Sequence, residues 1–359
     1  MNFVTSKRIR KILEKYPCQF LLLLGMRSNG KSTAVKKLAF EDAWNNDELF
    51  FYVRRQGLDM KNYLVESYFK SVDGFNISEI THGQADGVIC KEGKIFTYKE
   101  DCGEKTIVKQ VGYFGALSIS TRWKSLNFPE VTNLIFEEFC TDGMYIDDEV
   151  NLLMQLVSTI ARLRSIHVFM IANTITDINP YFRYFELSEV FKQKPDTIDV
   201  YHNEDTTIDV FMTAPLENEE HESRKMYFGN FGKMIKNGDW QRDRKRQLEN
   251  PRKEYECIYS MVLNFQGKLF LMEFLEHSKN NNVDGHIWFI SPKNTKIKRN
   301  TRVISDVGIE SDYTTIGFVP LSKNETKLFS FLTMGKIAYS DNLTGTQFLQ
   351  AFSQMKRDL

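Results

Sequence analysis

Four short apolar runs, separated by polar segments, dominate the first half of the chain. They are Phe20–Leu24, Leu49–Val53, Val131–Phe136 and Ile166–Ala172. Runs of roughly four to eight mostly apolar residues predict strands that are buried on both faces, as in the middle of a parallel sheet.

Helical periodicity fills most of the intervals between these strands. The clearest case is 151–163, where Leu152, Leu153, Leu156 and Ile160 share one face of a helix. The remaining predictions are helices at 6–16, 31–43 and 60–72, and short strands with hairpins at 74–114. Strands that alternate with helices in this order predict an α/β domain with a parallel sheet.

The charge pattern changes near residue 200 and indicates a second domain. From 203 to 223 the chain carries seven acidic residues and no Lys or Arg, whereas 224–253 carries ten basic residues and three acidic ones. The predicted division is a first domain at 1–205, a linker region at 206–250 and a smaller α/β domain at 251–359. In the last part we expect strands at 256–265, 268–275 and 286–290, and helices at 323–339 and 344–356.

The overall composition limits the partners and the compartment of the protein. Its 359 residues include 47 basic and 47 acidic ones, so any surface that binds nucleic acid must be local. The five cysteines form no CxxC pair, which argues against a zinc ribbon or a disulfide framework and favours a reducing cytosol. No apolar run is long enough for a signal peptide or a membrane span, so we expect a soluble protein without a membrane partner.

A glycine-rich loop follows the first predicted strand. The segment from Gly25 to Ser32 reads GMRSNGKS and matches GxxxxGK[ST], with a helix predicted after it. In such a loop the backbone N–H groups face phosphates, Lys31 reaches the β- and γ-phosphates, and Ser32 holds Mg²⁺. An ordinary glycine turn is the alternative, and the flanking strand and helix favour ATP binding. The predicted nucleotide contacts are Gly25, Arg27, Ser28, Asn29, Gly30, Lys31, Ser32 and Thr33.

Two carboxylates end the third apolar strand, about 100 residues after the loop. Here Glu137 would hold Mg²⁺, and Glu138 would orient and deprotonate the attacking water. This is a Walker B pattern with an unusual Glu in its first position. The extra methylene of Glu137 shifts the metal contact, so the division of roles between the two acids stays open on the pattern alone.

Polar residues near the fourth strand complete the candidate ATP site. Asn173 follows that strand, where it could sense the γ-phosphate, although Asn is also a common turn residue. An arginine often neutralises the charge that develops during phosphoryl transfer, sometimes from a neighbouring subunit. The candidates are Arg54, Arg55, Arg162 and Arg164. For the last two, a favourable interaction with a helix C-terminus is an equally good interpretation.

Four segments resemble the DNA-packaging ATPases (encapsidation proteins) of small tailed phages of the phi-29 group. These are compact relatives of the large terminases, in the ASCE branch of P-loop ATPases. The segments are LLLLGMRSNGKSTA at 21–34, FFYVRR at 50–55, TNLIFEEF at 132–139 and IANTITDINPYFRYF at 171–185. The resemblance covers most of the chain, strongly to about residue 190 and loosely after it.

The resemblance implies an architecture and a task. It implies an ATPase domain, a small linker region and a C-terminal domain with the RNase H-like fold of the terminase nuclease but without its active site. It also implies a homomeric ring, thought to be pentameric, attached transiently to the portal of a procapsid in the host cytoplasm. There ATP hydrolysis would drive double-stranded DNA into the procapsid, and a packaging RNA is left open as a further partner.

The resemblance also assigns roles to individual residues. It makes Lys31 and Ser32 part of the P-loop, Glu137 the magnesium-side acid, Glu138 the catalytic glutamate, Asn173 the coupling residue and Arg162 the arginine finger that acts in trans. The match at Arg162 needs a gap of one residue, so Arg164 stays open. The group usually carries Asp where this chain has Glu137.

The second domain offers acids and basic residues but no clear catalytic set. A live nuclease would gather several carboxylates around two metal ions. The candidate acids are Glu273, Glu276, Asp306, Glu310 and Asp312. Since they form no clear set of metal ligands, a folded domain without catalysis is the favoured interpretation. The basic residues are Arg242, Arg244, Lys245, Arg246, Arg252, Lys253, Lys293, Lys296, Lys298 and Arg299. They could face DNA phosphates, an RNA or a portal, or form a solvated surface.

Three other classes of protein remain as alternatives. A helicase-like or AAA-type ATPase would need further motifs after Asn173, and none is clear. A non-catalytic nucleotide-binding module would tolerate the loss of Glu138. A small-molecule kinase would need a lid and an acceptor site, and neither is visible in the sequence.

Overall fold

The computed structural model divides the chain into two compact units, one on each side of residue 240. It describes residues 3–25, 29–141, 145–173, 179–187, 189–203, 206–213, 245–278, 285–297, 300–307, 313–317 and 323–355. The first unit therefore contains the described residues up to Thr213, and the second those from Lys245.

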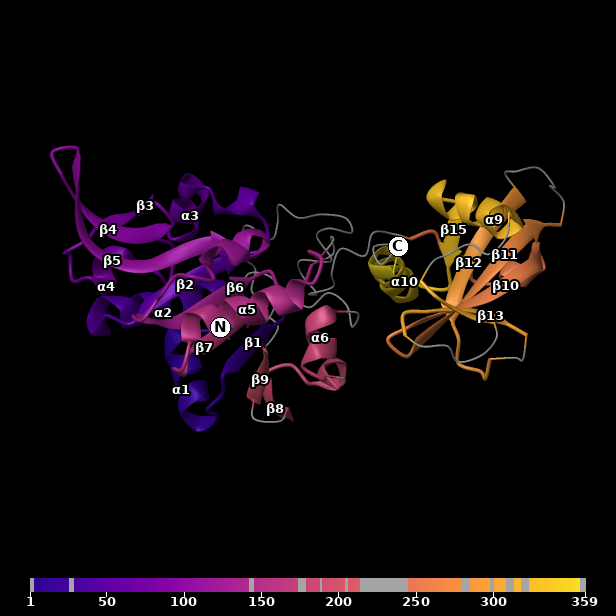
Figure 1. Cartoon of the computed structure of the whole chain (residues 1–359), viewed down its shortest axis with the longest axis horizontal. Coiled ribbons are helices and arrows are strands. Elements are labelled where there is room, and N and C mark those ends of the chain that lie inside the picture. The colour runs from indigo at the N-terminus through magenta and orange to yellow at the C-terminus, as the bar shows by residue number, and fades with distance from the viewer. Residues whose placement is uncertain are drawn as a thin grey trace. The chain divides into compact units, whose positions relative to one another are not determined.

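A nine-stranded mixed sheet forms the centre of the first unit (Figure 1). Its order is β3-β4-β5-β2-β6-β7-β1-β9-β8. The strands are β1 Phe20–Leu24, β2 Leu49–Arg54, β3 Gly87–Lys91, β4 Lys94–Asp101, β5 Glu104–Ala116, β6 Val131–Glu137, β7 His167–Ile171, β8 Thr197–Asn203 and β9 Thr206–Met212. The six strands from β5 to β9 in this order are parallel, and β3, β4 and β8 add antiparallel edges.

The fully apolar strands lie in the middle of this sheet, as the sequence predicts. Every residue of β1 is buried, and β1 pairs in parallel with β7 on one side and β9 on the other. The strand β7 separates β1 from β6, so the glycine-rich loop and the acidic strand end are not on neighbouring strands. Because the strands run parallel, the ends of β1, β2, β6 and β7 still open at the same edge of the sheet.

Helices cover the two faces of the sheet. They are α1 Ser6–Lys15, α2 Lys31–Asn46, α3 Asn62–Tyr68, α4 Ile77–Ile80, α5 Glu149–Ala161 and α6 Pro180–Tyr184, with a 3-10 turn η1 at Gly57–Met60 and another, η2, at Leu117–Trp123. The side chain of Thr5 accepts a hydrogen bond from the N–H of Arg8 and caps α1. The residue before α2 is Gly30, in the left-handed conformation with φ 87°.

Several boundaries differ from the prediction. The expected linker at 206–250 begins with a strand of the sheet, because β9 pairs with β1 over Ile208–Met212. Its alternating pattern, TTIDVFM, lies within the acidic stretch, which hid it. The expected helix at 60–72 is shorter, and α4 interrupts the region 74–114 where only strands and hairpins were predicted.

The second unit contains a six-stranded mixed sheet with the order β14-β13-β10-β11-β12-β15. The strands are β10 Tyr255–Phe265, β11 Lys268–His277, β12 His286–Pro292, β13 Arg302–Ser305, β14 Thr314–Ile316 and β15 Ile337–Tyr339, and the helices are α9 Lys323–Thr333 and α10 Asn342–Met355. The predicted helix at 323–339 is wrong in its last part. It ends before Gly335, whose φ of 72° breaks the helix, and β15 follows as an edge strand beside β12.

Candidate functional site

The loop after β1 is shaped by two glycines with positive φ. Gly25 has φ 141° and Gly30 has φ 87°. A Cβ atom on Gly25 would overlap the hydroxyl of Thr213, and one on Gly30 would lie 2.9 Å from the carbonyl oxygen of Val4. The N–H of Val4 also donates to the carbonyl of Asn29, at 3.0 Å. Segments from both ends of the first unit therefore lie against Gly25, Asn29 and Gly30, the described residues of the loop.

Lys31 turns back into this loop from the first turn of α2. Its ammonium group donates to the carbonyl of Gly25 at 3.2 Å, to Oδ1 of Asn29 at 3.0 Å and to Oδ1 of Asn173 at 3.4 Å. Burial lowers the pKa of Lys31 to about 7, because desolvation disfavours the charged ammonium group. A buried cation in a ring of oxygens is suited to an anionic ligand. The structure thus brings together Lys31 and Asn173, the ends of β1 and β7.

The first acid of the Walker B pair is buried at the end of β6. The hydroxyl of Tyr52 donates to Oε2 of Glu137, whereas Oε1 is buried and accepts no hydrogen bond within the described residues. Burial and the carboxylate together raise the pKa of Tyr52 well above its ordinary value, so the phenol keeps its proton. A buried carboxylate oxygen without a donor fits a Mg²⁺ site, since Mg²⁺ takes oxygen ligands. With Ser32 in the first turn of α2, the residues present fit the metal that the loop implies.

The second acid, Glu138, leaves the sheet with an unusual backbone. Its φ is 60°, and its N–H donates to the carbonyl of Ile171 at 2.8 Å. Its side chain is two-thirds exposed and forms an ion pair with Arg54, which lies at the end of β2. The guanidinium of Arg54 also lies over the ring of Tyr68, 4.8 Å from its centre. The carboxylate of Glu138 is therefore held on the β2 side in this state.

The predicted arginine fingers differ in how far they are engaged. Arg164 donates to three carbonyls, those of Phe128, Val131 and Ile160, at 2.8 to 3.0 Å, which indicates a structural role. Arg162 follows α5 with φ 55°, and its guanidinium is exposed and donates to the carbonyl of Leu126 at 3.0 Å. Arg55 is buried in an ion pair with Glu149.

Arg162 lies at the opposite edge of the sheet from Lys31 and Glu138. It comes just before β7 begins, and the N–H of Val168 in β7 bonds to the carbonyl of Gln19 at the start of β1. The five residues of β7 place roughly 16 Å between the two edges. The structure therefore does not bring Arg162 to the ATP site of its own chain.

Two of the predicted nucleotide contacts lie outside the described residues, and some residues of the site were not predicted from the sequence. Arg27 and Ser28 lie outside the described residues, whereas Thr33 is in the first turn of α2. The contributions of Thr213, Tyr52 and Glu149 were not predicted. Tyr52 had a signal, because its side chain is a polar group on a buried strand two residues before Arg54. Thr213 and Glu149 had no such signal, since each is far along the chain from the residue it contacts, Gly25 and Arg55 respectively.

The second sheet does not gather its candidate carboxylates. Glu273 pairs with Arg252, Glu276 lies 3.3 Å from His286, and Asp306 accepts from the N–H of Gln266 at 3.1 Å. Glu310 and Asp312 lie outside the described residues. Within the ranges that the structure describes, no three His, Cys, Asp or Glu side chains are grouped to hold a metal ion. No helix in those ranges is long and apolar enough to cross a bilayer.

The sheet order, the glycine-rich loop after β1 and the two acids at the end of β6 are those of a P-loop ATPase. Residues 10–272 match the model of the family described as podovirus DNA encapsidation protein (Gp16), and the chain belongs to this family. It is accordingly a DNA-packaging protein of the phi29 type.

Individual relatives agree with this assignment. The DNA packaging protein of Bacillus phage phi29 is 25% identical over 252 residues, which cover 67% of this chain and 68% of the relative. That of Bacillus phage B103 is 26% identical over 253 residues, covering 67% and 70%. A chain of the bacteriophage phi-29 viral genome packaging motor assembly has a similar fold, with a TM-score of 0.54 at 19% identity, covering 99% of this chain and all of that one.

Proposed function

We propose that this chain translocates double-stranded viral DNA into a procapsid and hydrolyses ATP at the interfaces of a homomeric ring. The observation that carries the proposal is the separation of the site's parts. Lys31 and Glu138 follow strand ends at one edge of the sheet, and the exposed Arg162 lies at the other. A complete site for phosphoryl transfer with an arginine finger then requires a second copy of the chain.

Within one chain, the loop and Lys31 bind the substrate. The triphosphate of ATP replaces the carbonyl and amide oxygens that now surround the ammonium group of Lys31, and the phosphate charge favours its protonated form. Ser32 and Glu137 would hold Mg²⁺, which would neutralise charge on the phosphate oxygens. Asn173 contacts Lys31 at 3.4 Å, so it lies where the loss of the γ-phosphate would be felt.

Glu138 acts as the general base that orients and deprotonates the attacking water. In the present arrangement Arg54 holds its carboxylate. This ion pair competes with the catalytic position, so hydrolysis requires Glu138 to leave Arg54 and turn toward the γ-phosphate. A backbone held at φ 60° limits this change to the side chain.

Arg162 supplies positive charge to the neighbouring subunit. Its guanidinium is exposed, as a finger that reaches another subunit must be. A finger in trans makes hydrolysis depend on ring assembly and is worth about 10³ to 10⁵ in turnover. We assign the finger to Arg162 rather than Arg164, because the guanidinium of Arg164 is already engaged with three carbonyls.

The second unit is an RNase H-like domain that binds DNA or the portal without nuclease catalysis. The support is its topology: β10, β11 and β12 form an antiparallel meander, and β13 and β14 continue in parallel beside β10. Its basic residues, among them Lys245 and Arg246, suit phosphate contacts. The ring is a pentamer that attaches to the portal in the host cytoplasm. A packaging RNA is one candidate partner for the basic residues of the second unit.

A mixing experiment tests the shared site. Arg162→Ala and Glu138→Gln should each bind ATP and fail to hydrolyse it. In randomly mixed equimolar rings, roughly a quarter of the interfaces combine an intact Glu138 with an intact neighbouring Arg162, so part of the DNA-stimulated activity should return. The control mixes Arg162→Ala with Arg162→Ala/Glu138→Gln and should stay inactive. If mixed rings form but activity does not return, Arg162 does not act in trans, and Arg164 is tested in the same way.

A further inference from the structure

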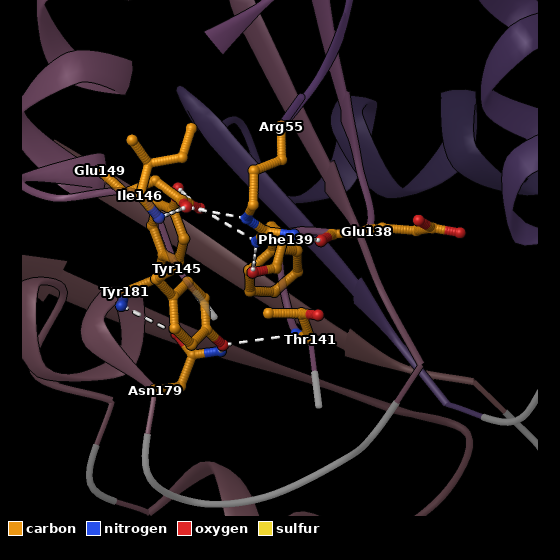
Figure 2. Close-up of polar contacts among 9 residues, drawn as sticks. All are labelled: Arg55, Glu138, Phe139, Thr141, Tyr145, Ile146, Glu149, Asn179 and Tyr181. Carbon is orange, nitrogen blue, oxygen red and sulfur yellow. Dashed lines mark hydrogen bonds and ion pairs between the residues drawn. The ribbon is translucent and has the colours of Figure 1, made fainter. Parts of the chain in front are cut away.

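A second arginine next to the end of β2, Arg55, binds the backbone of the two residues that follow β6, Glu138 and Phe139. Figure 2 shows Arg55 between the end of β6 and the start of α5. Its Nη1 donates to the carbonyl of Glu138 at 3.0 Å, and its Nη2 donates to the carbonyl of Phe139 at 2.9 Å. Two consecutive peptide groups, the first belonging to the proposed general base, thus depend on one buried side chain.

The guanidinium of Arg55 is itself fixed by Glu149 in the first turn of α5. Nε and Nη2 of Arg55 donate to the two carboxylate oxygens at 2.8 and 3.0 Å, a bidentate ion pair. The N–H of Ile146 donates to Oε2 at 2.8 Å, and the hydroxyl of Tyr181 donates to Oε1 at 2.7 Å. With four donors on two oxygens, this buried carboxylate is fully satisfied and defines one orientation of Arg55 (Figure 2).

The network continues to the start of α6. The ring of Tyr145 packs against the guanidinium of Arg55, 5.0 Å from its Cζ. The side-chain amide of Asn179 donates to the hydroxyl of Tyr145 at 3.0 Å, and its Oδ1 caps α6 by accepting from the N–H of Tyr181 at 2.8 Å. The strand that carries Glu138 is therefore linked to both α5 and α6.

The backbone of Glu138 needs such support. A non-glycine residue at φ 60° is disfavoured and persists only where its surroundings hold it. Its N–H is bonded to Ile171 and its carbonyl to Arg55, so its peptide groups are fixed on both sides. We propose that Arg55 is a positioning residue for ATP hydrolysis: it sets the backbone from which the Glu138 carboxylate reaches the attacking water. This inference rests on the proposed role of Glu138.

A purely structural ion pair makes a different prediction, and a double variant separates the two. Arg55→Met/Glu149→Leu replaces the buried pair with apolar side chains, a change that commonly preserves stability. If Arg55 only stabilises the fold, the double variant keeps its turnover. If Arg55 positions Glu138, the variant folds and binds ATP with an affinity within about threefold of the parent, yet kcat falls roughly 100-fold, as for a misplaced catalytic group.

The measurement uses the full chain with duplex DNA and ATP, and records Tm, nucleotide affinity, KM and kcat. In Glu149→Gln, Arg55 remains and can still donate to the carbonyls of Glu138 and Phe139. This variant should therefore lose less than about tenfold in kcat. Arg10→Met is the matched control. That arginine also pairs with an acid, Asp42, and donates to a carbonyl, that of Leu38, away from the site. It should leave kcat unchanged.

The outcomes are distinct. A double variant with parental kcat overturns the positioning role. If the double variant does not fold, Arg55→Lys carries the test, because a lysine keeps the charge beside Glu149 but cannot reach both carbonyls. A folded Arg55→Lys with parental kcat overturns the proposal, and a kcat loss at unchanged ATP affinity supports it. Glu138→Gln is measured in parallel. Full turnover there overturns both the proposed function of Glu138 and its positioning, whereas an inactive Glu138→Gln beside an active double variant overturns the positioning alone.

Discussion

The two sheets of this protein carry similar side chains and arrange them in different ways. In the first sheet, the residues that follow β1, β6 and β7 meet, so Lys31 and Asn173 are in contact and Glu138 is hydrogen-bonded to the end of β7. In the second, Glu273, Glu276 and Asp306 each face a different partner. The first sheet gathers its charged and polar groups at one edge, whereas each of these acids of the second sheet has a separate partner.

Strand direction is one contribution to this difference. Parallel strands open their carboxyl ends at one edge, where backbone and side-chain groups converge on a ligand. The meander β10-β11-β12 is antiparallel, so polar residues at successive strand ends alternate between two edges. Among the residues that the structure describes, the gathered groups lie in the first sheet, and the following experiments test that contrast.

The largest effect is expected from the acids. Glu138→Gln removes the proposed base and should lower kcat by about 10² to 10⁴ while ATP binding is kept. The equivalent change in the second sheet, Glu273→Gln, removes an acid paired with Arg252 and should leave kcat unchanged. Steady-state hydrolysis with bound-nucleotide measurements decides. A normal rate in Glu138→Gln would contradict the site.

The glycines with positive φ provide the next comparison. In Gly25→Ala the new Cβ overlaps Thr213 at φ 141°, which should cost about 2 to 4 kcal/mol and weaken ATP binding roughly 30-fold or more. Gly267→Ala, in the β10–β11 turn, has φ 78° and no atom within 4 Å of the new Cβ. It should lower stability by about 1 to 2 kcal/mol with no effect on ATP affinity. Equal effects of the two variants on ATP binding would refute the contrast.

For DNA binding, unlike ATP hydrolysis, substitutions in the second unit should have the larger effect. Replacing Arg244, Lys245 and Arg246 with Ala should reduce the slope of log K against log salt by about 0.9 for each DNA phosphate that the protein no longer neutralises. Arg244 lies outside the described residues. The matched change, Lys7, Lys11 and Lys15 to Ala on α1, removes the same charge from the first unit. Should this control flatten the slope as much, the DNA-binding surface is not specific to the second unit.

The smallest effect concerns protons. Burial lowers the pKa of Lys31 to about 7 and that of Lys268 to about 8, from an ordinary 10.5. Since the unfolded chain binds more protons between these values and pH 10.5, each lysine destabilises the fold most at low pH, and stability rises with pH through that window. At pH 8, ATP phosphates should raise only the pKa of Lys31, so binding takes up close to one proton. Calorimetry in buffers of different ionisation enthalpy measures this uptake. It should vanish in Lys31→Met and persist in Lys268→Met.

Local patterns were enough to predict most of the elements. The four apolar runs correspond to β1, β2, β6 and β7, and the helix predicted after the glycine-rich loop corresponds to α2. The prediction failed where neighbours in space decide the conformation. In the segment 337–339, pairing with β12 makes a strand out of residues that continue a helical pattern. In 206–212, pairing with β1 makes a strand out of part of a predicted linker.

By itself, the sequence determined the glycine-rich motif, Lys31, the two acids and the order of most strands and helices, because each depends on residues close together along the chain. Only the tertiary structure decided that Arg54 holds Glu138, that Arg55 and Glu149, which are 94 residues apart, fix its backbone, and that Thr213 lies against Gly25. It also placed Arg162 at the opposite edge from Lys31. Such contacts depend on which strands pair and in which direction. No spacing along the chain records them, because the free energy that selects the pairing comes from burying the whole sheet.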